Sequence, residues 1–404
     1  MRFLTGIIAA AWALAAGAHA APSATDLAAI AAVESRLTPT GAADGKPLAA
    51  RMAELKVPGV SIAFIEDGKV KWTRSYGVSD AADGRPVTPD TLFQAASMSK
   101  AVAAAALKLV DQGRLDLDGD VNPRLKIWQV PPSAYTTVEK VTLRRLLSHS
   151  AGLTVSGFPG YVPGKPVPTD VQILDGQPPA NTPAVRAFER PGQGYAYSGG
   201  GYTVAQLLMT EAGGQPFPAL LDRLVLRPAG MRSSTFVQPL PQALVRKAAS
   251  GHNAKGDVIP GQRNTYPEYA AAGLWTTPSD YGRFLIALQN AYAGLPRAIL
   301  RQPTAQAMLT PVLSGYALGM VIEPRGARVA IQHGGSNAGF QCQSFAFLDG
   351  SRQGVVVMTN GDAGGRVARE VLGALQVAYG WGEAGPPPEG SGRRAPFTPP
   401  AAAQ

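Results

Sequence analysis

Ser97 and Lys100 are the residues whose types and spacing most directly suggest chemistry. A serine hydroxyl is a nucleophile once a base takes its proton, and a lysine amine becomes such a base when burial or nearby positive charge lowers its pKa. On a helix, residues three apart lie on one face, about 5–6 Å apart at Cβ. The Ala- and Leu-rich stretch from Ala101 to Gln112 predicts a helix that ends at Gly113, with Ser97 at its start. The helix N-terminus would favour the negative charge that develops during acyl transfer.

Other hydrolase signatures are absent from the sequence. It contains no Gly-x-Ser-x-Gly nucleophile turn, no His-Glu-x-x-His zinc motif and no glycine-rich phosphate loop. The four histidines lie far apart along the chain, so we expect no metal and no cofactor. Taken alone, the Ser97–Lys100 pair is ambiguous, because a serine at the start of a helix also serves as a simple cap.

Two later motifs favour the catalytic interpretation. Residues 195–202 (YAYSGGGY) stand directly before a predicted helix, and residues 333–336 (HGGS) stand at the end of a predicted strand. With these three motifs in this order, the chain resembles the class C β-lactamase superfamily, which includes D,D-peptidases, D-aminopeptidases and family VIII carboxylesterases. The stretches 146–153 (LLSHSAGL) and 272–278 (AGLWTTP) agree with the same pattern. The resemblance spans roughly residues 50–380.

The resemblance implies a role for each matching residue. Ser97 is the acylated nucleophile, and Lys100 shares its proton. Tyr197 matches the family tyrosine, a general base that later protonates the leaving group. Tyr195, two residues earlier, is the alternative for this role. The backbone N–H groups of Ser97 and Ser336 form the oxyanion hole, an arrangement in which each donor contributes roughly 3–4 kcal/mol to the transition state.

The chain departs from the family pattern at two positions that the resemblance assigns, together with Gly335, to substrate binding. Gly199 stands where the family often has an asparagine, whose amide would contact the acylamino group of the substrate. His333 stands where β-lactamases usually have a lysine, and an unperturbed histidine is mostly neutral at pH 7. Both changes weaken recognition of a β-lactam or a peptide carboxylate, so acyl transfer is expected but efficient β-lactamase activity is not.

The secondary-structure pattern predicts how these motifs are positioned. Asp67-Gly68 between two β-rich runs predicts a hairpin over residues 57–76. Four further strands are predicted at 316–322, 329–332, 340–348 and 354–358, followed by a last helix at 366–379. We therefore expect an α/β (α+β) fold of the β-lactamase/transpeptidase type, in which both chain ends build one antiparallel sheet flanked by helices, with an inserted and mostly helical lobe.

The two ends of the chain differ in composition from the rest. Arg2, an apolar stretch and Ala18-His19-Ala20 indicate a signal peptide at residues 1–20, with cleavage after Ala20. We expect one catalytic domain at 21–382, with an α/β part at about 21–113 and 272–382 and a helical lobe at about 114–271. Residues 383–404 are rich in Pro, Gly and Ala, which predicts a disordered tail. The protein is thus expected to be secreted or periplasmic, without a membrane anchor after cleavage.

Several other residues are predicted to be structural. Cys342, the only cysteine, lies in an alternating stretch and is interpreted as a small packing residue. His149 is expected to bond locally in a buried turn, and Trp275 to pack in the core. The long irregular loop 158–179 is expected to wall the substrate cleft.

Charge excludes one class of function. The net charge is +9, but the 37 basic residues are scattered rather than gathered in a stripe, so no nucleic acid partner is expected.

The sequence predicts a secreted serine hydrolase that acts through an acyl-enzyme on small esters or on peptide or amide substrates. A β-lactamase or D,D-carboxypeptidase is the alternative within this class, and a non-catalytic binding protein on the same scaffold is the alternative outside it. The sequence leaves the oligomeric state open.

Overall fold

The computed structural model describes residues 22–39 and 44–385. The predicted signal peptide at 1–20 and most of the predicted tail at 383–404 lie outside these residues. Near the end of the described chain, Trp381 is 1% exposed, and its ring stacks on Phe345 with 5.1 Å between the centroids. The polypeptide is therefore anchored in the core up to this tryptophan.

One sheet of seven antiparallel strands organises the described chain, in the order β3-β2-β1-β9-β8-β7-β6. The predicted hairpin with its turn at Asp67-Gly68 is confirmed, because β1 and β2 pair on either side of it. The central pair joins the two ends of the chain, with Ile62 of β1 opposite Val357 of β9. The strands are β1 (Gly59–Glu66), β2 (Lys69–Asp80), β3 (Arg85–Pro86), β6 (Val321–Arg325), β7 (Arg328–Asn337), β8 (Phe340–Phe347) and β9 (Gly354–Thr359), and β4 (Phe93–Gln94) pairs separately with β5 (Trp275–Thr276).

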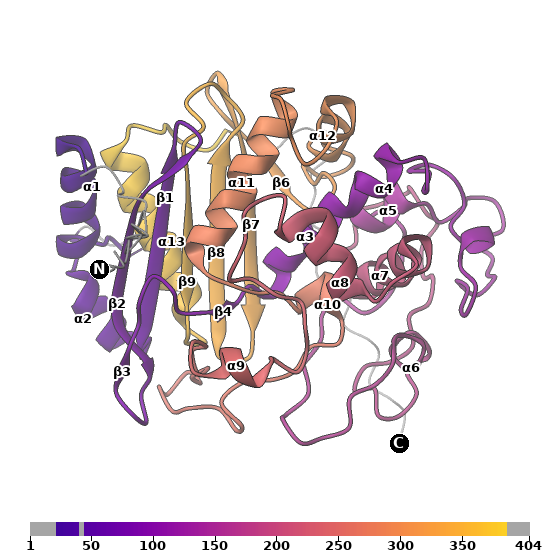
Figure 1. Ribbon diagram of the computed structural model, residues 1–404, viewed down its shortest axis with the longest axis horizontal. Coiled ribbons are helices and arrows are strands. Elements are labelled where there is room, and N and C mark those ends of the chain that lie inside the picture. Colours follow the sequence, from indigo (N-terminus) through magenta and orange to yellow (C-terminus); the bar gives the residue numbers. More distant parts are fainter. Residues whose placement is uncertain (1–21, 40–43, 386–404) are drawn as a thin grey trace, which may run out of the picture.

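Helices cover both faces of this sheet, so its central strand β9 is buried along its whole length (Figure 1). Successive residues of a strand point to opposite faces. In β9, Val355 and Val357 pack in the apolar cluster under α13 (Gly364–Ala378), while Val356 and Met358 pack in the cluster under α11 (Pro278–Tyr292). On the α13 side, the outer layer is completed by α1 (Ala24–Ser35) and α2 (Leu48–Glu54). The predicted fold class is confirmed.

The segment between the two groups of strands contains short helices joined by long stretches without regular secondary structure. Tyr202, Val204 and Leu207 of α7 lie in the same apolar cluster as the α11 face of the sheet, so this segment and the sheet share one core. Its helices and helical turns are η1 (Ala96–Met98), α3 (Ser99–Ala104), η2 (Ala105–Leu107), α4 (Lys108–Asp111), η3 (Asn122–Arg124), α5 (Leu143–Leu147), α6 (Asp170–Asp175), α7 (Gly199–Gly213), α8 (Phe217–Leu221), η4 (Asp222–Leu226), α9 (Gln242–Val245) and α10 (Tyr269–Ala272), and α12 (Gln302–Met308) follows α11.

Two details of the predicted elements are wrong. Residues 316–320 do not form a strand, and β6 instead runs from Val321 to Arg325. It includes Pro324, which an edge strand tolerates because its missing N–H faces away from the ladder. The sequence Thr277-Pro278-Ser279-Asp280 also predicts a capping box at the start of α11, in which Thr277 and Asp280 satisfy each other's N–H groups. Thr277 does accept the Asp280 N–H, but the Asp280 carboxylate does not close the box. It accepts hydrogen bonds from Ser233 N–H at 2.7 Å and from the Ser234 hydroxyl at 2.9 Å.

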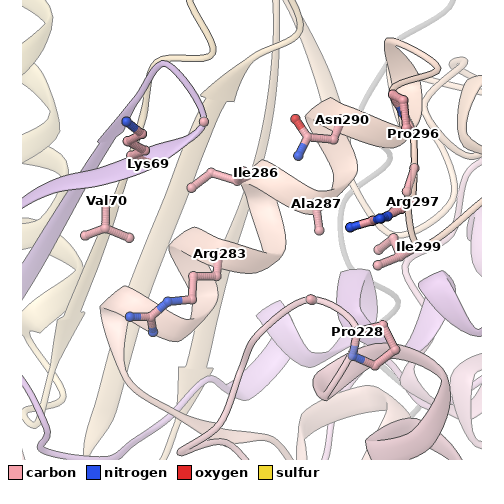
Figure 2. A pocket seen from close by; sticks show the side chains of 13 residues that line it. Lys69, Val70, Pro228, Arg283, Ile286, Ala287, Asn290, Pro296, Arg297 and Ile299 are labelled. Carbon is pink, nitrogen blue, oxygen red and sulfur yellow. The ribbon is translucent and has the colours of Figure 1, made fainter. Parts of the chain in front are cut away.

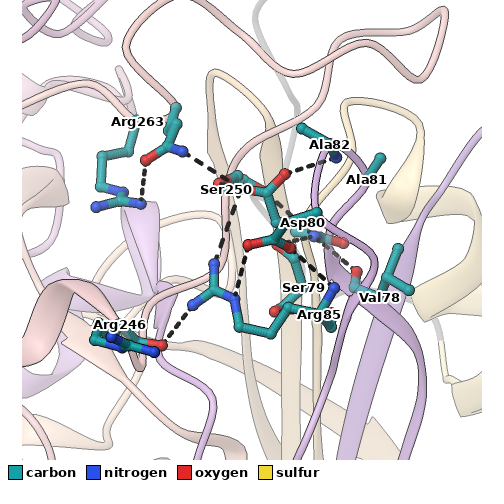
Figure 3. Close-up of polar contacts among 12 residues, drawn as sticks. Val78, Ser79, Asp80, Ala81, Ala82, Arg85, Arg246, Ser250 and Arg263 are labelled. Atoms are coloured by element: carbon teal, nitrogen blue, oxygen red, sulfur yellow. Dashed lines mark hydrogen bonds and ion pairs between the residues drawn. The ribbon is translucent and has the colours of Figure 1, made fainter.

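A polar network ties the end of β2 to the segment before α10 (Figure 3). The Asp80 carboxylate is buried and accepts hydrogen bonds from the Ala82 N–H at 2.8 Å and from the Ser250 hydroxyl at 2.6 Å. The Arg85 guanidinium lies 3.8 Å from the same carboxylate and donates to the carbonyl oxygen of Arg246. Because a buried carboxylate is costly without partners, this network fixes how the segment crosses the sheet edge.

Candidate active site

Ser97 stands on a turn that backbone contacts hold in place. Ala95 N–H donates to the Leu274 carbonyl at 2.9 Å, and Leu274 N–H donates to Ser99 Oγ at 3.0 Å. Between them, Ala96 has a φ of 49°, in the left-handed region that non-glycine residues rarely adopt. Such backbone strain persists only where the surroundings over-determine it, and it often occurs at functional sites. Ser97 is partly exposed although its neighbours are buried.

The side chain of Lys100 reaches back one turn to the serine. Its Nζ lies 3.2 Å from Ser97 Oγ and donates to the Ala271 carbonyl oxygen at 2.9 Å. Lys100 is 2% exposed, and this burial lowers its pKa to about 7. No ion pair of the described residues includes it. A lysine in this state is an amine for part of the time at neutral pH, with a lone pair available to the Ser97 hydroxyl.

Tyr197 meets the same serine from another side. Its side chain is hydrogen-bonded to Ser97, and its ring centroid lies 4.9 Å from Lys100 Nζ. Burial raises the pKa of the Tyr197 phenol above its ordinary value. Tyr195 lies further along the same aromatic group, with its ring centroid 5.7 Å from that of Tyr316. Of the two tyrosines that the sequence offered, the structure therefore places Tyr197 against Ser97 and Lys100.

Strand β7 passes directly beside the turn that carries Ser97, and Gly335 makes this approach possible. A Cβ at Gly335 would lie 2.3 Å from the Ala95 carbonyl oxygen and 2.5 Å from Cys342 Sγ. No side chain fits in this space, so the glycine serves the packing of the strand against the nucleophile turn. Cys342 is 4% exposed and donates to the same Ala95 carbonyl at 3.0 Å, in agreement with a packing role.

Ser336 is positioned by the hairpin between β7 and β8. Asn337 and Phe340 pair next to the two-residue turn, and Ser336 is opposite Gln341. Hydrogen-bonded and non-hydrogen-bonded pairs alternate along an antiparallel ladder, and a two-residue hairpin closes on a bonded pair. Ser336 thus belongs to a non-bonded pair, and its N–H points away from β8. Since β6 pairs only with Arg328–Gln332, no sheet partner of the described chain takes up this N–H.

Both ring nitrogens of His333 are already occupied. Nδ1 donates to the Gly334 carbonyl at 2.5 Å, so in the neutral ring Nε2 accepts the Tyr316 hydroxyl at 2.8 Å. Burial, followed by the nearby Lys100, lowers the pKa of His333 to about 4. His333 is therefore uncharged at neutral pH, as its ordinary pKa suggested, but its ring is held by Tyr316 rather than directed freely toward a substrate.

Gly199 begins helix α7 and offers no side chain to the site. A Cβ at this position would lie 2.8 Å from Cε2 of Phe158. The space of the family asparagine is thus partly taken by an aromatic ring from the start of the long loop 158–179. The loop is less irregular than predicted, because Thr169 and Gln172 form a capping box that starts α6.

The sequence pattern missed three contributors to the site. The Ala271 carbonyl, which holds Lys100, carries no signal, because any residue supplies a carbonyl oxygen. The left-handed backbone of Ala96 is equally invisible, since alanine is not a residue type that indicates positive φ. Tyr316, which holds His333, fell in a stretch that was predicted as a strand.

Trp275 is fully buried, as predicted. A pocket of about 350 Å³ beside α11 is lined by Lys69, Arg283 and Arg297 over an apolar floor, but by none of the residues named above for catalysis (Figure 2).

In the described part of the chain, no group of His, Cys, Asp and Glu could hold a metal ion. Among the same residues, no helix is both long and apolar enough to cross a bilayer.

On this sheet, a serine and a buried lysine lie one helical turn apart with a tyrosine beside them, which is the arrangement that the resemblance to the β-lactamase superfamily implies. Comparison with known proteins agrees. The family model described as Beta-lactamase matches residues 47–378, and the chain belongs to the β-lactamase family.

Curated relatives include enzymes of different names. Esterase EstB of Burkholderia gladioli is 29% identical over 251 residues, which cover 58% of this chain and 64% of the esterase. The unguisins hydrolase ungD of Aspergillus violaceofuscus is 26% identical over 351 residues, which cover 76% of this chain and 58% of that hydrolase. The chain thus spans less than two thirds of the length of these relatives.

Solved structures show the same fold at low identity. The octameric penicillin-binding protein homologue from Pyrococcus abyssi has a TM-score of 0.67 and 23% identity, covering 83% of this chain and 76% of that one. D-amino acid amidase from Ochrobactrum anthropi SV3 has a TM-score of 0.66 and 22% identity, covering 87% of this chain and 99% of the amidase.

Proposed function

We propose that this serine hydrolase cleaves small esters through an acyl-enzyme on Ser97. The observation that carries the proposal is the 3.2 Å contact between Ser97 Oγ and the buried Nζ of Lys100. The pKa of Lys100, about 7, lets this amine take a proton at neutral pH. The second contact to Ser97, from Tyr197, gives the proton a route toward the leaving group.

The reaction follows from these positions. Ser97 Oγ attacks the ester carbonyl carbon while its proton passes to Lys100 Nζ. The N–H groups of Ser97 and Ser336 hold the oxyanion of the tetrahedral intermediate. Collapse of the intermediate breaks the C–O bond, and the leaving alcohol receives the proton through the Tyr197 hydroxyl. Water then attacks the carbonyl carbon of acyl-Ser97 and gives a proton to Lys100. The second tetrahedral intermediate breaks its C–Oγ bond, Lys100 returns the proton to Ser97 Oγ, and the acid leaves.

Substrate preference follows from what the site lacks. A β-lactam or a peptide with a free C-terminus presents a carboxylate, and the neutral His333, with both ring nitrogens occupied, offers no cation at its position. An acylamino group would hydrogen-bond to the asparagine amide that the family often has at position 199. In this chain residue 199 is glycine, and Phe158 occupies part of the space of that side chain. A small ester requires neither contact. The similarity to an esterase from Burkholderia gladioli supports the same choice.

The test compares kcat/KM for p-nitrophenyl butyrate and for the cephalosporin nitrocefin in one preparation, with Ser97→Ala as the blank for both. We expect measurable turnover of the ester and poor turnover of nitrocefin. If nitrocefin is preferred by more than about tenfold, roughly 1.4 kcal/mol in transition-state binding, the ester preference is wrong and a β-lactamase or D,D-carboxypeptidase takes its place.

We further propose that the enzyme is exported and processed after Ala20. The support is the sequence of residues 1–20, with a basic start, an apolar run and Ala18 and Ala20 at the cleavage positions. Expression of the full chain in a bacterial host should yield a periplasmic protein that begins at Ala21. Retention of residues 1–20 in the mature protein would contradict this.

A further inference from the structure

His149 is a buried residue of the LLSHSAGL motif that the reaction described above does not use. It lies two residues after the end of α5 and has a φ of 56°, a conformation in which histidine, asparagine and aspartate are enriched. It is 1% exposed, and its ring lies among tyrosines, with centroid distances of 4.1 Å to Tyr197, 4.7 Å to Tyr316 and 5.2 Å to Tyr202.

The sequence predicted that His149 would bond locally in a buried turn. It is buried and its N–H faces the Leu146 carbonyl at 3.4 Å, but its ring and carbonyl bond to a distant segment. Its main contacts lie 47 and 49 residues further along the chain. The His149 carbonyl accepts the Ala196 N–H at 2.8 Å, and ring Nδ1 accepts the Ser198 N–H at 3.0 Å. The two N–H groups belong to the residues immediately before and after Tyr197. One residue therefore holds the backbone on both sides of the tyrosine and packs its ring against the phenol.

We propose that His149 is the positioning residue for Tyr197, and that its Nδ1 is the acceptor that sets the tyrosine hydroxyl against Ser97. The inference rests on the proposed role of Tyr197. Proton transfer requires donor and acceptor at hydrogen-bond distance, and a displacement of about 1 Å costs roughly a hundredfold in rate. The Ser198 hydroxyl, which caps α7 by accepting the Gly201 N–H, fixes the start of the helix but not the Tyr197 ring.

The state of the ring agrees with this role. A neutral imidazole whose Nδ1 accepts a hydrogen bond carries its proton on Nε2. Burial, followed by Lys100 and His333, lowers the pKa of His149, so the ring stays neutral and Nδ1 remains an acceptor. The titratable groups around the ring are the basic side chains of Lys100 and His333 and four tyrosines, at positions 195, 197, 202 and 316. None of these neighbours is acidic.

The experiment uses two variants of equal shape. His149→Asn retains an acceptor near Nδ1 and tolerates the left-handed backbone, whereas His149→Leu has similar volume but no acceptor. Both lose the imidazole ring, so their difference reports the hydrogen bond to Ser198 together with the backbone preference at φ 56°, and the double variants described next separate the two. We expect kcat/KM for p-nitrophenyl acetate to be about 10–100-fold lower in the leucine variant than in the asparagine variant, with the loss in kcat rather than in KM.

Each variant is then combined with Tyr197→Phe. If His149 acts through the tyrosine hydroxyl, the two double variants have equal rates, because that hydroxyl is gone. The inference is overturned if asparagine and leucine differ by less than twofold, or if their ratio persists in the Tyr197→Phe background, which would indicate general structural damage. If the leucine variant does not fold, His149→Gln replaces it. The side-chain carbonyl of glutamine extends beyond the position of Nδ1, so it does not place an acceptor where Nδ1 stands. If Tyr197→Phe alone retains the wild-type rate, the proposed role of Tyr197 fails instead.

Discussion

The Nζ of Lys100 lies 4.9 Å from the centre of the Tyr197 ring, and both side chains contact Ser97. The same burial acts on the two groups in opposite directions. It lowers the pKa of the lysine to about 7 and raises the pKa of the phenol above its ordinary value. In the free enzyme near neutral pH, the amine is thus the group able to accept the serine proton, and the phenol is protonated and able to pass one on.

The pH dependence of acylation follows from the lysine. Below pH 7 Lys100 is protonated and cannot accept the Ser97 proton, so kcat/KM should fall about tenfold for each unit of pH. Above pH 7 the amine is free and the rate should reach a plateau. The measurement is kcat/KM for p-nitrophenyl butyrate from about pH 3 to pH 9, corrected for spontaneous hydrolysis. A limb centred near pH 4 would assign the base to His333, whose pKa is about 4, and would contradict the role of Lys100.

Tyr197→Phe should lower kcat at least about a hundredfold, because it removes the hydroxyl that passes the proton to the leaving group. Tyr195→Phe is the matched control. It removes the same atom two residues away, from a ring whose centroid lies 5.9 Å from that of His149. We expect its kcat within about fivefold of the wild type. A large loss in Tyr195→Phe with a small loss in Tyr197→Phe would show that the register of the motif is wrong.

Gly335→Ala should damage both stability and activity. The added Cβ would lie 2.3 Å from the Ala95 carbonyl oxygen, so β7 and the nucleophile turn must separate. Overpacking of this kind costs about 1–3 kcal/mol, and we expect that loss in the free energy of unfolding together with a drop in kcat of at least about tenfold. Gly334→Ala is the control, since its Cβ would meet mainly the flexible end of Gln343 at 2.9 Å. Equal effects of the two substitutions in urea unfolding and in kcat would contradict the account.

Much of the fold could be predicted because its signals are local. Asp67-Gly68 predicted the first hairpin, the alternating stretch around Cys342 predicted β8, and the apolar run 354–358 predicted β9. The catalytic candidates were also accessible, since Ser97 and Lys100 stand three residues apart on one helix. What joins them to the rest of the site is not local. The contact between Lys100 and the Ala271 carbonyl spans 171 residues and involves a backbone atom, so no residue type marks it.

Burial is the other quantity that the sequence did not provide. His333 was correctly expected to be neutral from its ordinary pKa. The hydrogen bond from Tyr316 that occupies its Nε2 could not be expected, because residue 316 was predicted inside a strand, whereas β6 begins only at Val321. Gly335 was expected to bind substrate, and this stays a prediction, but its close packing beside Ala95 was not foreseen. In both cases the missing information was which atoms of distant segments come within van der Waals contact.

The identity of the nucleophile is tested most directly by mapping a covalent adduct. The protein is treated with a fluorophosphonate, digested, and the modified peptide is sequenced by mass spectrometry. Ser99→Ala serves as the control, since Ser99 Oγ accepts the Leu274 N–H and its loss should cost about 1–3 kcal/mol of stability but not the reaction. We predict one adduct, on Ser97, that persists in Ser99→Ala and is absent from a folded Ser97→Ala, which also fails to hydrolyse esters. An adduct on another serine, or ester hydrolysis that survives in Ser97→Ala, would contradict the acyl-enzyme on Ser97.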